Sequence, residues 1–337
     1  MKAAVERPAA MEIEACDALA QLIAAPPAEP PGYTPESWEL LRRAAQVHGV
    51  APLLGARMTR LGAWGDHPFA LWAADQLAAN RLRIARMQAE LAEVLAAFDA
   101  AGVPVMPLKG AVLAALVYPD PGERPMADLD LLLHVGDLLR GEEILAGLAY
   151  DKVFTGWKHV KFSRPGNREI VDPDREHPDN PRVLEVHPRC QERLREETVD
   201  LTDRLWAAAR PGEILGTRAW LPSAETLWLH LLIHATHHVL MNRFRLTQLV
   251  DLVRLRPFLS GPADLLAAIQ AIEGTAGLGA RAVYAPLALA QRYFPHGPTE
   301  ELLAGLRVQL SPAIAAWGDG LDLFHCCYLD PAPWRDA

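Results

Sequence analysis

The chain has 337 residues, of which 50% are hydrophobic and 22% are charged, so it is not mainly disordered and has ample apolar material for a core. Its length predicts two domains or one large decorated domain. The formal net charge is -9, whereas non-specific binding to nucleic acid relies on an excess of basic residues. The composition therefore predicts a folded protein without non-specific DNA binding.

Cysteine usage and hydropathy indicate a cytoplasmic protein. The four cysteines are scattered and form no C-x-x-C motif, which is typical of free thiols in a reducing compartment. Acidic residues interrupt the N-terminal stretch, so it lacks the apolar segment of a signal peptide. No run of about 18 uncharged apolar residues occurs elsewhere. We therefore expect no transmembrane helix and no membrane partner.

The first 101 residues are expected to form a helical region. Helices are predicted over 10–25, 37–47 and 66–101, and a proline-rich linker is predicted over 26–35. In the longest helix, Leu91, Leu95 and Phe98 recur at helical spacings and predict one apolar face. Gly102 ends this helix.

Strands and helices alternate in the middle of the chain, which is typical of an α/β or α+β domain. Strands are predicted over 103–108, 128–134, 157–163 and 182–187, with helices over 111–117 and 137–148 and a surface loop over 172–181. Helices return over 227–240, 246–255, 264–272 and 281–293. The predicted domains are therefore residues 1–101, 102–222 and 223–337.

Two acidic residues, Asp128 and Asp130, are two positions apart on a predicted strand and so lie on the same face. Adjacent carboxylates repel each other, and a strand tolerates this repulsion when the pair faces water or when a cation lies between them. Mg²⁺ suits this position because it prefers carboxylate oxygens and the phosphates of a substrate as ligands. A polar strand end is the alternative interpretation of an isolated pair. Glu185 and His187 share one face of the predicted strand 182–187, so an adjacent position would complete a set of three carboxylates.

Basic residues near these acids are candidate phosphate ligands. Lys109 and Gly110 lie at a predicted strand-to-helix junction, where glycine permits close approach of a ligand and the helix N-terminus offers free N–H groups. Arg124, four residues before the first aspartate, is a second candidate. His159 and Lys161 alternate on the predicted strand 157–163 and are candidates for the same cleft.

The segment 108–133, LKGAVLAALVYPDPGERPMADLDLLL, combines Leu-Lys-Gly, a tyrosine, a turn with Gly and Arg, and an Asp-hydrophobic-Asp motif. LEVH at 184–187, LWLHLLIHATHH at 227–238 and LVDL at 249–252 follow it. In this order the motifs resemble the uncharacterised nucleotidyltransferase-like family of the polymerase-β-type nucleotidyltransferase superfamily. The resemblance covers about residues 100–255.

The resemblance implies an α+β fold, in which a nucleotidyltransferase-like mixed β-sheet core is flanked by N-terminal and C-terminal helical regions. It implies that Asp128, Asp130 and Glu185 are the catalytic and metal-binding carboxylates and that Mg²⁺ or Mn²⁺ is the cofactor. The candidate nucleotide-binding residues are Lys109, Gly110, Arg124, Lys161, His187 and His234. Lys109 and Gly110 stand where the superfamily has a Gly-Ser or Gly-Gly motif.

The expected reaction is attack by an acceptor hydroxyl or phosphate on the α-phosphorus of a nucleoside triphosphate such as ATP, with Asp130 or Glu185 as base. The acceptor is a small molecule, a peptide, a protein or an RNA. One alternative is another phosphate-linked group transfer, either the tailoring of a peptide or natural product or a toxin-type modification of RNA or protein. Another is a nucleotide-binding module without catalysis.

The predicted helix 227–240 carries four histidines, at positions 230, 234, 237 and 238. Histidines at i and i+4 have the spacing of metal ligands, but the glutamate of an H-E-x-x-H motif is absent. Three interpretations are open. His234 and His238 form the centre of a zinc hydrolase, they belong to a packed polar face, or, as the resemblance implies, they shape the substrate pocket or pair with Asp251.

Overall fold

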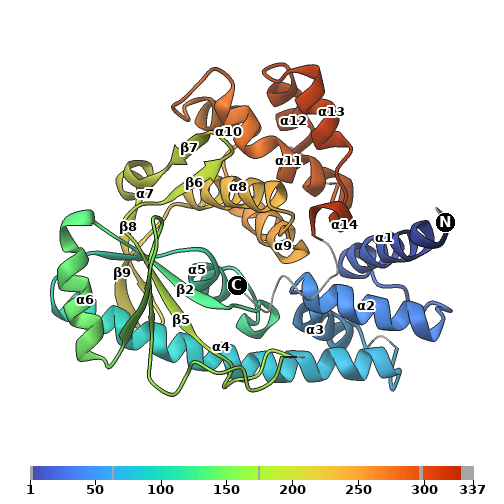
Figure 1. Ribbon diagram of the computed structural model, residues 1–337, viewed down its shortest axis with the longest axis horizontal. Coiled ribbons are helices and arrows are strands. Elements are labelled where there is room, and N and C mark those ends of the chain that lie inside the picture. The colour runs from blue at the N-terminus through green and yellow to red at the C-terminus, as the bar shows by residue number, and fades with distance from the viewer. Residues whose placement is uncertain (1–2, 63, 174, 296–298, 328–337) are drawn as a thin grey trace. The chain divides into compact units, whose positions relative to one another are not determined.

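A computed structural model describes residues 3–62, 64–173, 175–295 and 299–327, which form two compact units (Figure 1). The first unit comes from Met1–Asp75, Arg193–Val199 and Leu231–Ala337, and the second from Gln76–Glu192 and Asp200–His230. The expected regions 1–101, 102–222 and 223–337 divide the chain differently, and that three-part division stays a prediction.

The first unit is mainly helical. It contains α1 (Ala3–Ala24), α2 (Pro35–Val47), α3 (Ala51–Leu61), the start of α4 (Pro68–Ala100), the end of α8 (Ala224–Leu240), α9 (Leu246–Leu255), α10 (Pro262–Gln270), α11 (Leu278–Tyr293), α12 (Thr299–Arg307), α13 (Pro312–Asp319) and α14 (Leu323–Cys326). The helices expected in these parts of the chain are confirmed, whereas α3 and α12 to α14 have no counterpart among them. The helix α3 carries a proline in its first turn, where proline is tolerated rather than disruptive. In the described part of the chain, no helix is both long and apolar enough to cross a membrane.

A buried histidine joins separate helices within this unit. His48 follows α2 and is 0% exposed. Its Nδ1 accepts a hydrogen bond from the backbone N–H of Leu246 at 3.2 Å, so the ring proton lies on Nε2, which is 3.5 Å from Sγ of Cys16. Burial, together with the charge of Arg245, lowers the pKa of His48 to about 3. The neutral ring is therefore part of the folded structure.

Acid is expected to destabilise the protein through His48. Its folded pKa is about 3 and its unfolded pKa is about 6.5, so its contribution is complete above about pH 6.5 and is lost as the pH falls through about 3. In His48→Asn, the amide oxygen accepts the same N–H without titrating. Between pH 6 and pH 5 this variant should lose about 1 kcal/mol less stability than the parent. Urea unfolding at both pH values measures the difference, and equal losses would contradict this role.

The second unit is built on a mixed sheet of five strands. Their order is β1 (Val105–Pro107), β2 (Asp128–Leu133), β5 (Val183–His187), β4 (Val160–Ser163) and β3 (Asp151–Thr155). The strands β2 and β5 are parallel, and the other neighbours are antiparallel. The unit also contains α5 (Lys109–Leu116), α6 (Leu138–Gly147), α7 (Thr202–Ala208) and the hairpin of β8 (Arg210–Ile214) and β9 (Thr217–Leu221). A further hairpin, β6 (Gln191–Leu194) and β7 (Glu197–Asp200), has residues in both units. The expected α+β class is confirmed.

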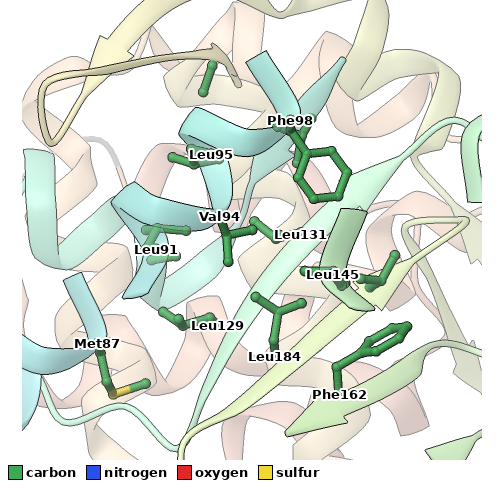
Figure 2. Packing of buried hydrophobic residues seen from close by; sticks show 14 of the residues in the cluster. Met87, Leu91, Val94, Leu95, Phe98, Leu129, Leu131, Leu145, Phe162 and Leu184 are labelled. Atoms are coloured by element: carbon green, nitrogen blue, oxygen red, sulfur yellow. The ribbon is translucent and has the colours of Figure 1, made fainter. Parts of the chain in front are cut away.

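The long helix α4 covers one face of the sheet (Figure 2). Its apolar residues pack with residues of β2, β4, β5 and α6, and none of the following is more than 2% exposed: Met87, Leu91, Val94, Leu95, Phe98, Leu129, Leu131, Leu145, Phe162 and Leu184. Strand side chains alternate between two faces, so the intervening residues of β2 and β5 lie on the other face. That second face carries the acidic residues singled out in the sequence.

Candidate active site

Polar side chains occupy the sheet face opposite the core. In the parallel register of β2 and β5, Asp130 is paired with Glu185, and in the antiparallel register of β4 and β5, Glu185 is paired with Lys161. Asp128 and His187 share this face because each is two residues from a member of that row. Asp130, Glu185 and His187 are at most 5% exposed. The expected adjacency of the two acid-bearing strands is therefore confirmed.

The turn from β1 into α5 brings Lys109 to the cluster. The backbone N–H of Leu108 donates to the carbonyl oxygen of Asp130 at 2.9 Å, and Nζ of Lys109 lies 2.6 Å from Oδ1 of Asp130. Lys109 has a φ of 47°, in the left-handed region that strains an L-residue, so its surroundings must hold it there. Burial opposes its charge, but Asp130 and Asp128 outweigh burial and raise the pKa of Lys109. Lys109 is thus a partner of Asp130, and its contact with nucleotide stays a prediction.

Close packing explains the glycine that follows. A Cβ at Gly110 would lie 2.5 Å from Nη1 of Arg124 and 2.7 Å from Sδ of Met126. The guanidinium of Arg124 therefore lies against the junction of β1 and α5, and it also donates to the carbonyl oxygen of Pro125 at 2.9 Å. The structure thus brings together Lys109, Gly110 and Arg124, the three candidates for phosphate contact.

Substitution of Gly110 by alanine is expected to destabilise the protein by about 1–3 kcal/mol, because the buried side chain of Met126 must shift to admit the methyl group. The matched control is Gly136→Ala, where an added Cβ meets nothing within 4 Å. Urea unfolding of both variants measures the effect. If Gly110→Ala were as stable as the control, the contacts around Gly110 would not require glycine.

Two of the three acids are held as anions by neighbouring groups. Oδ1 of Asp130 also lies 2.8 Å from Nε2 of His187. Burial would raise the pKa of Asp130, but Lys109 and His187 outweigh it and hold this pKa well below the usual value. Burial and the charge of Asp130 disfavour the Glu185 anion, yet His187 beside it and the charge of Lys109 outweigh them and lower the pKa of Glu185 to about 2.

Asp128 differs from both. Among the described residues, none forms an ion pair with its carboxylate or donates a hydrogen bond to it. Burial, followed by the charges of Asp130 and Glu185, raises the pKa of Asp128 to about 6. An acid in these surroundings is stabilised as an anion by any cation that approaches it.

Two histidines flank Glu185, namely His159, directly before β4, and His187 on β5 itself. Oε2 of Glu185 lies 3.2 Å from Nδ1 of His159 and 3.6 Å from Nε2 of His187, and its Oε1 lies 3.0 Å from Nζ of Lys161. One possible ligand atom from each of His159, Glu185 and His187 lies within 4.8 Å of the others. In the part of the chain that the structure describes, no other group of three histidine, cysteine or acidic side chains brings its ligand atoms this close together. The group includes Glu185 but neither Asp128 nor Asp130, the other two expected metal ligands.

Three further polar residues lie near the cluster. Lys158 forms an ion pair with the buried Glu192. His230 is 3% exposed, and burial together with the charge of Lys109 lowers its pKa to about 3. The sequence drew attention to His230 because it belongs to the predicted histidine-rich helix. It gave no signal for Lys158 and Glu192, because their pairing depends on tertiary packing and not on a local pattern.

The histidines near the end of α8 belong to the first unit. The rings of His234 and His238 are 4.2 Å apart, and Nδ1 of His238 lies 3.3 Å from Oε1 of Gln248. No group of three possible metal ligands in the described ranges includes either histidine. A role of His234 in nucleotide binding, and its pairing with Asp251, stay predictions.

The protein is of the α+β class. Its mixed sheet has one apolar face, which packs against a long helix, and one acidic face. The model of the uncharacterised nucleotidyltransferase family matches residues 34–295. The chain therefore belongs to this family, as its motifs implied, and membership supports transfer of nucleotidyl groups as the general activity.

The chain is also similar to a solved structure, an antigenic nucleotidyltransferase-like protein from Paracoccidioides brasiliensis. The two are 14% identical, the match covers 71% of this chain and 96% of that chain, and the TM-score is 0.38. No curated protein matches the chain.

Proposed function

We propose that the protein transfers a nucleoside monophosphate from a nucleoside triphosphate to an acceptor, using Mg²⁺ or Mn²⁺ held by Asp128, Asp130 and Glu185. One observation carries this proposal. In a member of a nucleotidyltransferase family, Asp128 has no ion-pair or hydrogen-bond partner among the described residues, and burial together with the charges of Asp130 and Glu185 raises its pKa. A divalent cation bridged to phosphate relieves this repulsion.

The three acids fit a hard divalent cation to different degrees. Carboxylate oxygens are the ligands that Mg²⁺ prefers, and Asp128 has no competing partner among the described residues. Asp130 contacts its partners through Oδ1. Both oxygens of Glu185 contact neighbouring side chains, but Lys161, the partner of Oε1, is 34% exposed and is therefore the partner that a metal ion displaces most easily. When bound, the metal neutralises charge on the triphosphate and favours ionisation of the acceptor.

In the proposed reaction, an acceptor oxygen forms a bond to the α-phosphorus while the bond to the oxygen bridging to the β-phosphorus breaks. Pyrophosphate leaves, and the proton of an acceptor hydroxyl passes to solvent water. The lowered pKa values of Asp130 and Glu185 make both of them weak bases. We therefore assign these two residues to binding and orientation of the charged groups, not to proton removal.

The proposed nucleotide-binding residues are Lys109, Gly110, Arg124, Lys161, His187 and His234. The proposed acceptor is a small molecule, a peptide, a protein or an RNA. Another phosphate-linked transfer and a nucleotide-binding module without catalysis are the alternatives that an experiment must separate from nucleotidyl transfer.

Labelled nucleotides separate these functions. The purified protein is incubated with Mg²⁺, a cell extract and each nucleoside triphosphate labelled at the α- or the γ-phosphate. We expect an acceptor labelled from the α-position only, release of pyrophosphate, and loss of both on addition of a chelator. Label from the γ-position alone would indicate phosphoryl transfer, and nucleotide binding without any labelled acceptor would indicate a binding module. Asp203→Asn, at an exposed position of α7, is the control substitution.

A further inference from the structure

We infer that His159, Glu185 and His187 form an additional metal site, which takes a transition-metal ion of the Zn²⁺ class. This inference does not rest on nucleotidyl transfer. The antiparallel register of β4 and β5 pairs Val160 with Val186 and Lys161 with Glu185, and its continuation by one residue places His159 opposite His187. Their ring centroids are 5.3 Å apart. The backbone therefore presents two imidazoles and a carboxylate on one face of two neighbouring strands.

All three donor atoms lie within 4.8 Å of one another, and the two separations from Glu185 match those around one metal ion. Oε2 of Glu185 is 3.2 Å from Nδ1 of His159 and 3.6 Å from Nε2 of His187. With metal bonds of about 2.0–2.2 Å, neighbouring ligands of a tetrahedral ion lie about 3.3–3.6 Å apart. Both separations from Glu185 are close to this range, so each histidine already lies near enough to share an ion with this carboxylate.

His159 provides independent evidence that a partner belongs here. Its Nδ1 is a buried atom that makes no hydrogen bond to any described residue, even though a carboxylate oxygen lies 3.2 Å away. A buried ring nitrogen without a hydrogen bond is unfavourable, and a metal ion would satisfy it. The side chain as a whole is 19% exposed, so the ring lies at the edge of the cluster nearest to solvent.

Neighbouring groups orient the proposed ligands. Lys161 contacts Oε1 of Glu185, which leaves Oε2 directed to the histidines. Nε2 of His187 lies 2.8 Å from Oδ1 of Asp130, so a bound metal ion replaces the proton that these two groups share and has a further anion beside it. The contact of Lys161 with the non-ligating oxygen of Glu185 is the kind of interaction that orients ligands in metal centres.

The donor atoms select the class of metal. Two imidazole nitrogens with one carboxylate oxygen suit Zn²⁺, Co²⁺ and similar ions, whereas Mg²⁺ prefers oxygen ligands and water. Selectivity therefore distinguishes this site from the proposed Mg²⁺ site, although both use Glu185. The histidine pair of α8, His234 and His238, is the competing place for a transition-metal ion.

Titration of the chelator-treated, full-length protein with Co²⁺, followed by visible absorption, tests the inference. We expect one equivalent to bind, Zn²⁺ to displace it, and a large excess of Mg²⁺ to leave it in place. His159→Ala and the ring-preserving His159→Phe should each weaken Co²⁺ binding at least about tenfold. His234→Ala is the matched histidine control, and Asp203→Asn, at an exposed position of α7, is the acid control. Both should bind Co²⁺ as the parent does.

A parent protein that binds no Co²⁺, or His159 variants that titrate like the parent, would overturn the inference. Loss of binding in His234→Ala alone would assign the ion to α8 and would also overturn it. Thermal melts of the two His159 variants identify a folding defect, and the phenylalanine variant preserves ring packing if alanine does not. The readout is independent of transfer, so failure of the labelled-nucleotide experiment leaves this test intact.

Discussion

Replacing Asp130 by asparagine is expected to lower the free energy of unfolding by about 3 kcal/mol. The side chain of Asp130 is 2% exposed, and its Oδ1 contacts the ammonium of Lys109 at 2.6 Å and Nε2 of His187 at 2.8 Å. Asparagine preserves the shape but removes the charge. The ammonium of Lys109, which is only 13% exposed, then loses its nearest counter-charge, and a buried charge without its partner is strongly unfavourable.

Removal of the other partner provides the control. Lys109→Met should destabilise the protein by a similar amount, because it leaves the Asp130 carboxylate without the ammonium. The double variant should lose less than the sum of the two single variants, since neither buried charge is then left without its partner. Urea unfolding of the parent, the two single variants and the double variant completes this cycle. Fully additive losses would contradict the pairing.

Asp128→Asn is expected to have the opposite effect on the metal-free protein. It should be as stable as the parent or up to about 1 kcal/mol more stable, because it removes a buried charge and its repulsion from Asp130 and Glu185, and no described residue loses an ion pair or hydrogen bond. The same change should reduce nucleotidyl transfer by about 100-fold or more, since metal-ion catalysis contributes several kcal/mol to such reactions. It should also abolish the stabilisation by nucleotide that depends on Mg²⁺.

Thermal melts with and without Mg²⁺ and nucleoside triphosphate measure the stability arm of this prediction, and the labelled-nucleotide experiment measures transfer. Asp203→Asn should behave as the parent in both. The site assignment would be wrong if Asp128→Asn melted well below the parent without ligand and gained as much as the parent from Mg²⁺ and nucleotide.

The two-faced character of the sheet was predictable because it depends on local alternation. Leucines and aspartates alternate along β2, which predicts one apolar and one acidic face, and the burial of Leu129 and Leu131 against α4 confirms this. The spacing of Leu91 and Phe98 likewise predicted the core face of α4. Both patterns extend over residues that are neighbours in the sequence.

The ion pairs were not predictable in this way. Lysine at a strand-to-helix junction is compatible with a phosphate ligand and with a structural partner, and nothing local distinguishes them. The pairing of β1 with β2 brings Lys109 to Asp130. From the sequence alone, three clustered acids would predict that Asp130→Asn relieves repulsion. Because Asp130 and Glu185 both have cationic neighbours in the structure, we expect relief of repulsion on removal of the Asp128 charge instead.

The histidine group shows the same limit. His159 and Glu185 are separated by the loop that precedes β5, and a sequence pattern does not specify which strands become neighbours or in which register. The register of β4 and β5 places these side chains together. The alternation of His159 with Lys161 was a local signal, and it predicted a shared face but not the partner.

Anomalous scattering from Mn²⁺ tests the central claim most directly. Crystals of the protein are grown with Mn²⁺ and a nucleoside triphosphate analogue that cannot be cleaved between the α- and β-phosphorus. We predict an anomalous peak coordinated by Asp128 and Asp130 and by oxygens of the analogue, and no such peak in Asp128→Asn. Bound analogue with Mn²⁺ absent from these aspartates, or Mn²⁺ bound only by the two histidines and Glu185, would contradict the proposed site.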